Sequence, residues 1–261
     1  MCLILFAYRS HPEYGLVLAA NRDEFYDRPT REAAFWEDAP NILAGQDLKA
    51  GGTWMGITKT GRFGAITNYR DPGSNRTDAP SRGDLVKDFL AGHARPYDYL
   101  KIVQDKGQTY NGFNLIIGDL NELFYFSNRD GSIQSIKPGV HGLSNHLLNT
   151  PWPKVTRGTS RLHSLISKRE GFSREDVFNV LADRFQPSDK TLPDTGVGLE
   201  WERILSPLFI TSGVYGTRCA SILLLKYSGE VTFWERTFDR QTEDTPEITT
   251  REYVFKLSTD K

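Results

Sequence analysis

The sequence has little of several features that mark common protein classes. Two cysteines in 261 residues are too few for a disulfide framework and are typical of a reducing compartment. The opening apolar run, Cys2–Ala7, is too short for a membrane span and lacks the basic start of a signal peptide. Basic and acidic residues balance, 32 against 33, which leaves no positive excess for nucleic acid. We expect a cytoplasmic protein without a nucleic-acid partner or stable membrane insertion.

The chain is long enough to form its core without a metal or a disulfide. A chain of this length buries about three quarters of the surface that its unfolded form exposes. The histidines are scattered, without zinc-type spacing, at His11, His93, His141, His146 and His163. We find no internal repeat and no linker, and we expect one domain over residues 1–261 and no metal site.

Cys2 is the most informative residue. Removal of Met1 would place a thiol and a free α-amine on the same residue. An α-amine titrates near ~7.7 to 8.0 and a thiol near ~8.5, so this amine can accept the thiol proton at neutral pH without a histidine. The alternative is structural, since a cysteine ahead of Leu3–Phe6 can begin a buried strand and pack as a small hydrophobe.

Two apolar runs near the start predict a β-hairpin. Cys2–Tyr8 and Gly15–Asn21 are separated by a spacer rich in turn-forming residues. Asn21–Glu24, with the sequence NRDE, ends the second run. Because neighbouring strands lie about 4.8 Å apart, an in-register hairpin returns this polar cluster to the side of Cys2.

Other patterns predict strands and helices along the rest of the chain. Strands are expected over 53–58, 62–68, 113–117, 123–127, 132–136, 218–227, 230–237 and 252–257. Helices are expected over 81–90, 97–103, 155–168 and 173–184, with a loop over 186–198. Ser81–Asp84 and Ser173–Asp176 both have capping-box spacing. Hairpins combined with helices in pairs predict an α+β fold of largely antiparallel sheets with helices outside, as in a layered sandwich.

Five ordered blocks span nearly the whole chain. Besides NRDE they are 44–56 with 61–63 and 67–70, then 110–115, then 142–145 with 150–154, and finally 215–218. In order and spacing they resemble the NRDE family, also called the transport and Golgi organisation protein 2 family. That family in turn resembles the N-terminal nucleophile hydrolases, in the branch that includes choloylglycine hydrolases and penicillin acylases. The resemblance implies a four-layer αββα sandwich with the nucleophile at the end of a central strand.

The resemblance also implies roles for individual residues. Carried across by motif, Cys2 is the nucleophile, Asn68 an oxyanion-hole amide, Asn145 the second asparagine and Arg218 the late arginine. Asn145 has a structural alternative, because an asparagine in a turn of this kind commonly bridges loops through its side-chain amide.

The chain departs from the hydrolases at its second strand. They typically set an arginine and an aspartate three residues apart, whereas Arg22 and Asp23 are adjacent here. Adjacent strand residues point to opposite faces, so only one of the two can face Cys2. Arg22 or Arg218 would favour a thiolate, and Asp23 would hold the ammonium that the α-amine becomes.

A structural network is the alternative explanation of the NRDE cluster. In that case Arg22 pairs with Asp23, Glu24 or Asp47 and fixes the loop that leads to Pro29. Ion-pair networks and active sites share this composition, so both interpretations stay open.

The motifs favour cleavage or transfer of an acyl group from a small amide or thioester, with no cofactor required. The alternative function is a non-catalytic carrier, because the resemblance links the family to intracellular haem trafficking and to acyl-CoA and lipid homeostasis. In a haem carrier, Cys2, His141 or a tyrosine would be a transient axial ligand. The expected partner is a small-molecule ligand or acyl substrate, with haem as the ligand under the alternative.

Overall fold

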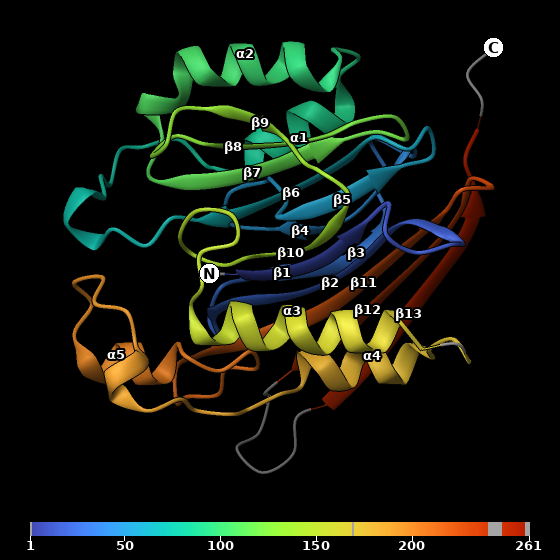
Figure 1. Cartoon of the computed structure of the whole chain (residues 1–261). Coiled ribbons are helices and arrows are strands. Elements are labelled where there is room, and N and C mark those ends of the chain that lie inside the picture. The colour runs from blue at the N-terminus through green and yellow to red at the C-terminus, as the bar shows by residue number, and fades with distance from the viewer. Residues whose placement is uncertain (1, 169, 240–246, 259–261) are drawn as a thin grey trace. The chain divides into compact units, whose positions relative to one another are not determined.

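The computed structural model describes residues 2–168, 170–239 and 247–258 (Figure 1). The chain divides into two compact units. The first unit comprises Met1–Asp27, Pro138–Ser144 and Leu148–Val254, and the second comprises Arg28–Lys137, Asn145–Leu147 and Phe255–Lys261. Each unit contains one β-sheet and helices that pack against it.

The sheet of the first unit has six strands among the described residues, in the order β10-β1-β2-β11-β12-β13. Its strands are β1 (Cys2–Tyr8), β2 (Tyr14–Phe25), β10 (Gly139–Leu143), β11 (Tyr215–Lys226), β12 (Glu230–Asp239) and β13 (Glu247–Lys256). The pairs β10–β1, β1–β2, β2–β11 and β11–β12 are antiparallel. The predicted hairpin of β1 and β2 is confirmed, and it lies at the centre of this sheet.

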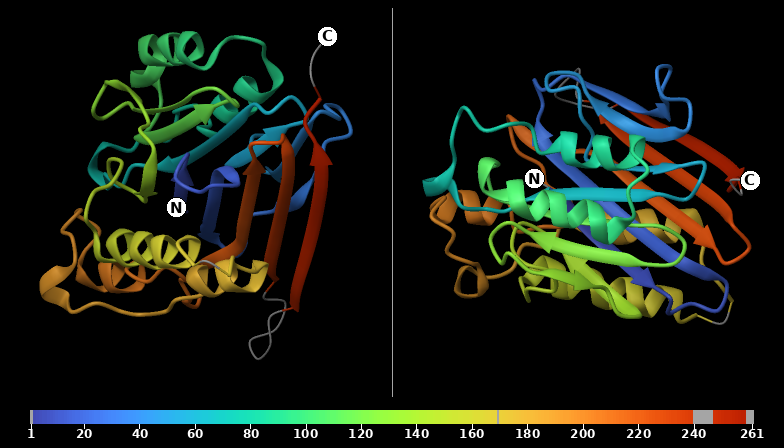
Figure 2. Two further views of the ribbon diagram at one scale, coloured as in Figure 1. Left: turned by 45° about the vertical axis from the view of Figure 1, so that its right-hand side comes forward. Right: turned by 90° about the horizontal axis from the view of Figure 1, so that it is seen from above.

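Two helices cover one face of this sheet (Figure 2). The helices of this unit are α3 (Pro153–Ile166), α4 (Arg174–Leu181) and α5 (Leu199–Ile204). Helix α3 packs on β1 and β10, and α4 packs on β2 and β11. Alternate residues of β1, such as Leu3 and Leu5, are fully buried against Val155 and Leu162 of α3 in one hydrophobic cluster. The apolar side chains at alternate positions of the strand therefore pack against the apolar face of the helix.

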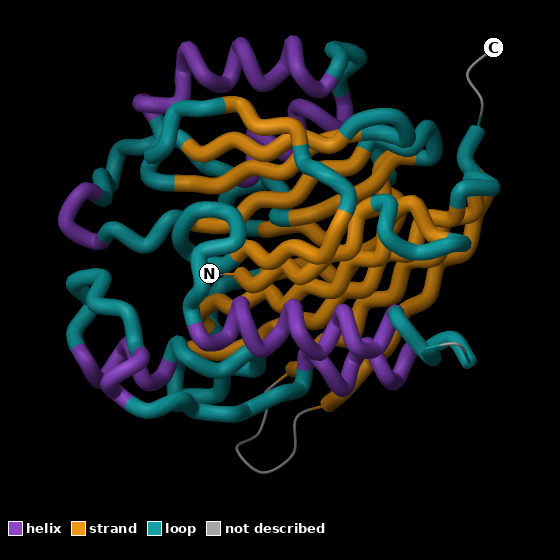
Figure 3. The backbone as a smooth tube through the Cα atoms, viewed as in Figure 1, coloured by secondary structure: helices purple, strands orange, loops and turns teal. Residues whose placement is uncertain are grey.

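The sheet of the second unit has seven strands in the described part of the chain, ordered β3-β4-β5-β6-β7-β8-β9, and each neighbouring pair is antiparallel. Its strands are β3 (Thr30–Phe35), β4 (Ile42–Asp47), β5 (Met55–Thr58), β6 (Phe63–Asn68), β7 (Phe113–Gly118), β8 (Leu123–Ser127) and β9 (Ile133–Ser135). Helices α1 (Gly83–Ala91) and α2 (Pro96–Lys106) pack on it. Figure 3 distinguishes these strands and helices by colour. The expected α+β fold with antiparallel sheets is confirmed.

None of the helices among the described residues combines the length and the apolar composition that crossing a membrane requires, and the longest, α3, has 14 residues.

The structure contains elements that the sequence patterns did not predict, namely β3, β4, β10 and α5. The capping box predicted at Ser173 is confirmed, because its hydroxyl accepts from the Asp176 N–H while the Asp176 carboxylate accepts from the Ser173 N–H. The one predicted at Ser81 is wrong. Helix α1 begins at Gly83 with Arg82 as its N-cap, so Ser81 lies one position too early to cap it.

Asn21 connects β2 to the segments that cover it. Its side chain is fully buried, and its Nδ2 donates to the backbone oxygens of Leu181 at 3.0 Å and Leu208 at 2.8 Å. Leu181 is the last residue of α4. The first residue of the NRDE tetrapeptide thus positions the end of a helix on the sheet.

Replacing Asn21 by alanine should lower the free energy of unfolding by at least ~2 kcal/mol, because two buried carbonyls lose their donor. Asn75→Ala is the control, since that residue is exposed, and it should change the free energy by less than ~0.5 kcal/mol. Urea unfolding followed by circular dichroism measures both. Equal stability of the two variants would contradict the role assigned to Asn21.

The two serines with the same spacing allow a matched test of capping. Ser173→Ala should cost about 1 kcal/mol, because α4 loses its N-terminal cap. Ser81→Ala should cost only a few tenths of a kcal/mol, because α1 has no side-chain cap. Chemical denaturation of both variants gives the comparison, and a larger loss at Ser81 would show that the caps have been assigned wrongly.

Candidate active site

Cys2 begins β1 directly opposite Arg22 of β2. Directly opposed residues of an antiparallel pair have their side chains on the same face, so the thiol and the guanidinium are neighbours. Burial raises the pKa of the Cys2 thiol, and the nearby Asp23 and Glu24 carboxylates act in the same direction, whereas Arg22 lowers it. At neutral pH this thiol is therefore protonated and needs a base before it can act as a nucleophile.

Arg22 lies between two cysteines. A β-bulge in β11 between Thr217 and Cys219 brings Cys219 opposite Arg22, so the register runs from Cys2 through Arg22 to Cys219. Arg22 is only 4% exposed. A buried charge requires polar neighbours. Polar side chains of β11 and β12 lie on the same face of the sheet as Arg22.

A buried polar cluster next to Arg22 was missed at the sequence level. On the same face as Cys219, Ser221 pairs with Glu235 of β12, and the Ser221 hydroxyl lies 3.3 Å from a Glu235 carboxylate oxygen. Both residues are 2% exposed. The available signal was a pair of polar residues at alternate positions of each strand, Cys219 with Ser221 and Glu235 with Thr237, on a face that is otherwise apolar.

The second thiol of this cluster is kept protonated. Burial, followed by the Glu235 carboxylate, raises the pKa of Cys219 well above its ordinary value. Both cysteines are free. The register separates them by two strand spacings, roughly 10 Å, which is farther than a disulfide spans.

Asp23 faces the helix side of the sheet, as its position next to Arg22 predicts. Its Oδ1 accepts a hydrogen bond from the Thr217 hydroxyl at 2.7 Å, and its backbone oxygen accepts one from the Tyr215 hydroxyl at 2.9 Å. Asp23 is 1% exposed. Thr217 thus holds the buried carboxylate and Tyr215 holds the backbone of the same residue, while the charge of the carboxylate still acts on the Cys2 thiol.

Arg218 occupies the β-bulge of β11. Its guanidinium donates to the backbone oxygens of Phe25 at 2.9 Å and Tyr26 at 3.0 Å, just after the NRDE tetrapeptide. These contacts hold the end of β2 against β11.

Asp47, one of the partners considered for Arg22, forms an ion pair with Arg28 at 2.7 Å, and both residues belong to the second unit.

The second unit contains both candidate asparagines. Asn145 is fully buried, its Nδ2 donates to the Asn68 backbone oxygen at 2.9 Å, and its backbone oxygen accepts from the Arg70 N–H at 2.7 Å. Asn145 is therefore a loop-bridging amide that holds the end of β6. Among the described residues, none accepts a hydrogen bond from the Asn68 side-chain amide.

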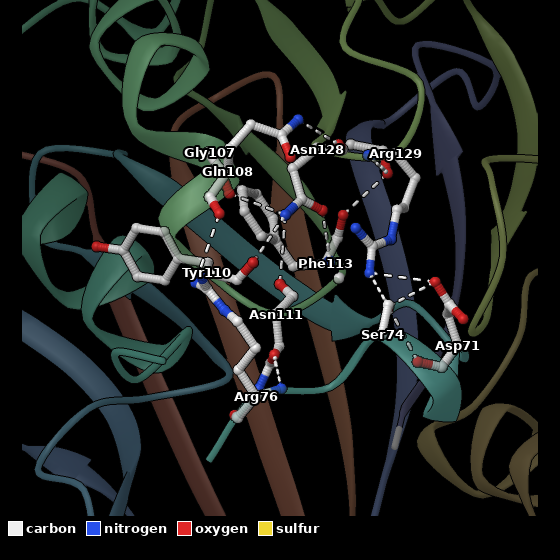
Figure 4. Close-up of polar contacts among 12 residues, drawn as sticks. Asp71, Ser74, Arg76, Gly107, Gln108, Tyr110, Asn111, Phe113, Asn128 and Arg129 are labelled. Atoms are coloured by element: carbon white, nitrogen blue, oxygen red, sulfur yellow. Dashed lines mark hydrogen bonds and ion pairs between the residues drawn. The ribbon is translucent and has the colours of Figure 1, made fainter. Parts of the chain in front are cut away.

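The loop that follows Arg70 is held by polar contacts within the second unit (Figure 4). The Arg129 guanidinium lies 3.2 Å from the Asp71 carboxylate, and Asn111 exchanges two hydrogen bonds with the Arg76 backbone. Asn128, just after β8, donates to the Gly107 oxygen at 2.9 Å. The contacts of Asp71 and Arg76 hold the chain that follows Asn68.

The described residues contain no group of three or more histidine, cysteine, aspartate or glutamate side chains placed to hold a metal ion. The ring of His141 stacks on Phe6 at 5.2 Å between centroids, and its Nδ1 lies 3.0 Å from the Asn149 amide nitrogen.

The fold is similar to that of solved hydrolase structures. The crystal structure of the C2A mutant of conjugated bile acid hydrolase from Clostridium perfringens aligns with 100% of this chain and 99% of that chain, with a TM-score of 0.50 and 10% sequence identity. At this identity the likeness concerns the fold alone, which is that of the N-terminal nucleophile hydrolases.

Relatives at higher identity are found over nearly the whole chain. The Transport and Golgi organization 2 homolog of Mus musculus is 37% identical over 278 residues, covering 98% of this chain and 99% of the relative. The Transport and Golgi organization protein 2 homolog of Homo sapiens is 36% identical over 277 residues, with the same coverage. The family pattern itself matches residues 1–240. The chain therefore belongs to the Transport and Golgi organisation 2 family.

Proposed function

We propose that this protein is an N-terminal-cysteine hydrolase that cleaves or transfers the acyl group of a small amide or thioester in the cytosol. The observation that carries the proposal is the placement of Cys2 at the start of β1, directly opposite the buried Arg22. The hydrolase-type fold and the two free thiols support it.

The reaction begins with removal of Met1. The raised pKa of the Cys2 thiol means that a base must take its proton, and the new α-amine is that base. Arg22 stabilises the resulting thiolate, and Asp23 offsets the charge of the ammonium. The thiolate then adds to the acyl carbonyl carbon, and a tetrahedral oxyanion forms.

Collapse of this intermediate breaks the bond to the leaving amine or thiol, which takes the proton from the ammonium. The acyl group remains on Cys2 as a thioester, and water or a second acceptor removes it. The family resemblance, and not the placement of the two units, assigns the side-chain amide of Asn68 to the oxyanion. Asn145, which donates to the Asn68 backbone oxygen, would then position that residue.

Intact-protein mass spectrometry tests the nucleophile. The purified chain should lack Met1 and should gain a single acyl adduct after incubation with a panel of acyl anilides and acyl thioesters. Cys2→Ser should abolish turnover, whereas Cys219→Ala should retain the adduct, because the Cys219 thiol is buried and kept protonated. Retained Met1 together with no adduct would refute the proposal and favour the carrier of haem or acyl lipid.

The role of the α-amine predicts a pH dependence. In a chain extended by residues ahead of Cys2, the thiol has no amine on its own residue, and its raised pKa should confine reaction with iodoacetamide to pH values above the ordinary range of thiols. The processed chain should react at neutral pH. Identical pH profiles of the two forms would exclude the amine as the base.

Asn68→Ala should lower kcat by about 10²-fold to 10³-fold, which corresponds to the loss of one oxyanion donor. Its free energy of unfolding should change little, because no described residue depends on that side chain. Asn75→Ala, in an exposed loop of the same unit, should leave kcat unchanged. Full activity of Asn68→Ala would remove this residue from the mechanism.

A further inference from the structure

The first unit contains a cavity of about 350 Å³ that the proposed reaction does not use. Its wall includes Phe178 and Leu181 of α4, Phe209, and Phe238 of β12. Phe178, Leu181 and Phe209 are buried, so the floor of the cavity is apolar. The rings of Phe209 and Phe238 meet edge to face at 4.9 Å between centroids. The volume lies in the range of small-molecule binding sites.

The cavity opens on the face of the sheet opposite to Cys2. Two residues of its wall, Thr217 and Ala220, are paired in register with Asp23 and Asn21, whose side chains face the helices. Cys2, in contrast, shares its face with Arg22. The sheet therefore separates the cavity from the thiol, and a molecule bound there is not positioned for acyl transfer to Cys2.

Two arginines at the cavity differ in their charge balance. The Arg236 guanidinium lies over the Phe178 ring at 3.9 Å and forms an ion pair with Glu175 at 2.8 Å. The guanidinium of exposed Arg184 lies over the Phe209 ring at 4.7 Å, and no carboxylate among the described residues pairs with it. The cavity thus combines an apolar floor with one positive charge that no described carboxylate neutralises.

We propose that this cavity binds an amphipathic monoanion, a molecule with an apolar body of aliphatic or aromatic carbon and one carboxylate or sulfonate. The apolar body displaces water from the phenylalanine and leucine side chains. The anion pairs with Arg184, whose planar guanidinium can donate two hydrogen bonds to a carboxylate or sulfonate. A single uncompensated cation favours one negative charge over the two of a phosphate monoester. The inference is independent of the reaction proposed for Cys2.

Isothermal titration calorimetry with decanoate tests the proposal on the full chain. The protein should bind decanoate with 1:1 stoichiometry, and Arg184→Ala should weaken binding about tenfold or more, because a charge-assisted contact is lost. Octan-1-ol, an apolar chain without the charge, should bind more weakly than octanoate. Ala182→Phe, at an exposed residue of the cavity wall, should also weaken decanoate binding by filling space.

Arg203→Ala is the control for loss of an arginine elsewhere in this unit, because Arg203 is exposed, pairs with Asp189 and lies outside the cavity wall. It should leave the affinity for decanoate unchanged. Circular dichroism confirms that each variant is folded. Lack of binding by the unaltered protein, an equal loss in Arg203→Ala, or equal affinity in Arg184→Ala would each overturn the proposal.

Discussion

The candidate site depends on one constraint, the register of three neighbouring strands in the first unit. Backbone hydrogen bonding between β1, β2 and β11 sets Cys2 opposite Arg22 and Arg22 opposite Cys219. A slip of one residue would turn a side chain of this row to the helix face, because side chains alternate along a strand. The β-bulge at Arg218 adds one residue to β11 and so maintains this pairing at the end of the sheet.

The alternation of side chains along β2 also places successive residues of the NRDE tetrapeptide on opposite faces of the sheet. Asn21 and Asp23 face the helices, where Asn21 holds the end of α4 and Asp23 is held by Thr217. Arg22 shares the opposite face with Cys2. Asn21 and Asp23 thus make structural contacts on the helix face, and the proposed reaction uses the face that carries Arg22. The same division sets the apolar cavity and the thiol on opposite faces of one sheet.

Local patterns predicted the features that depend on neighbouring residues. The hairpin of β1 and β2 follows from two apolar runs with a turn between them, and the capping box at Ser173 follows from a three-residue spacing. The same spacing failed at Ser81, because a cap also requires the helix to begin at the next residue, and α1 begins later. Strands β3 and β10 were missed because their sequences, TREAAF and GVHGL, lack the run of β-branched and aromatic residues that marks a strand of similar length such as β8.

The sequence by itself determined the family, the α+β class and the return of Arg22 to the side of Cys2. Only the tertiary structure decided that Cys219, more than 190 residues away from Arg22 along the chain, lies opposite it, and that the Glu235 carboxylate acts on the Cys219 thiol. It also decided which arginine at the cavity is neutralised, through the ion pair of Arg236 with Glu175. The physical reason is that spacing along a chain governs local backbone hydrogen bonds, whereas charge compensation and burial depend on which distant strands become neighbours.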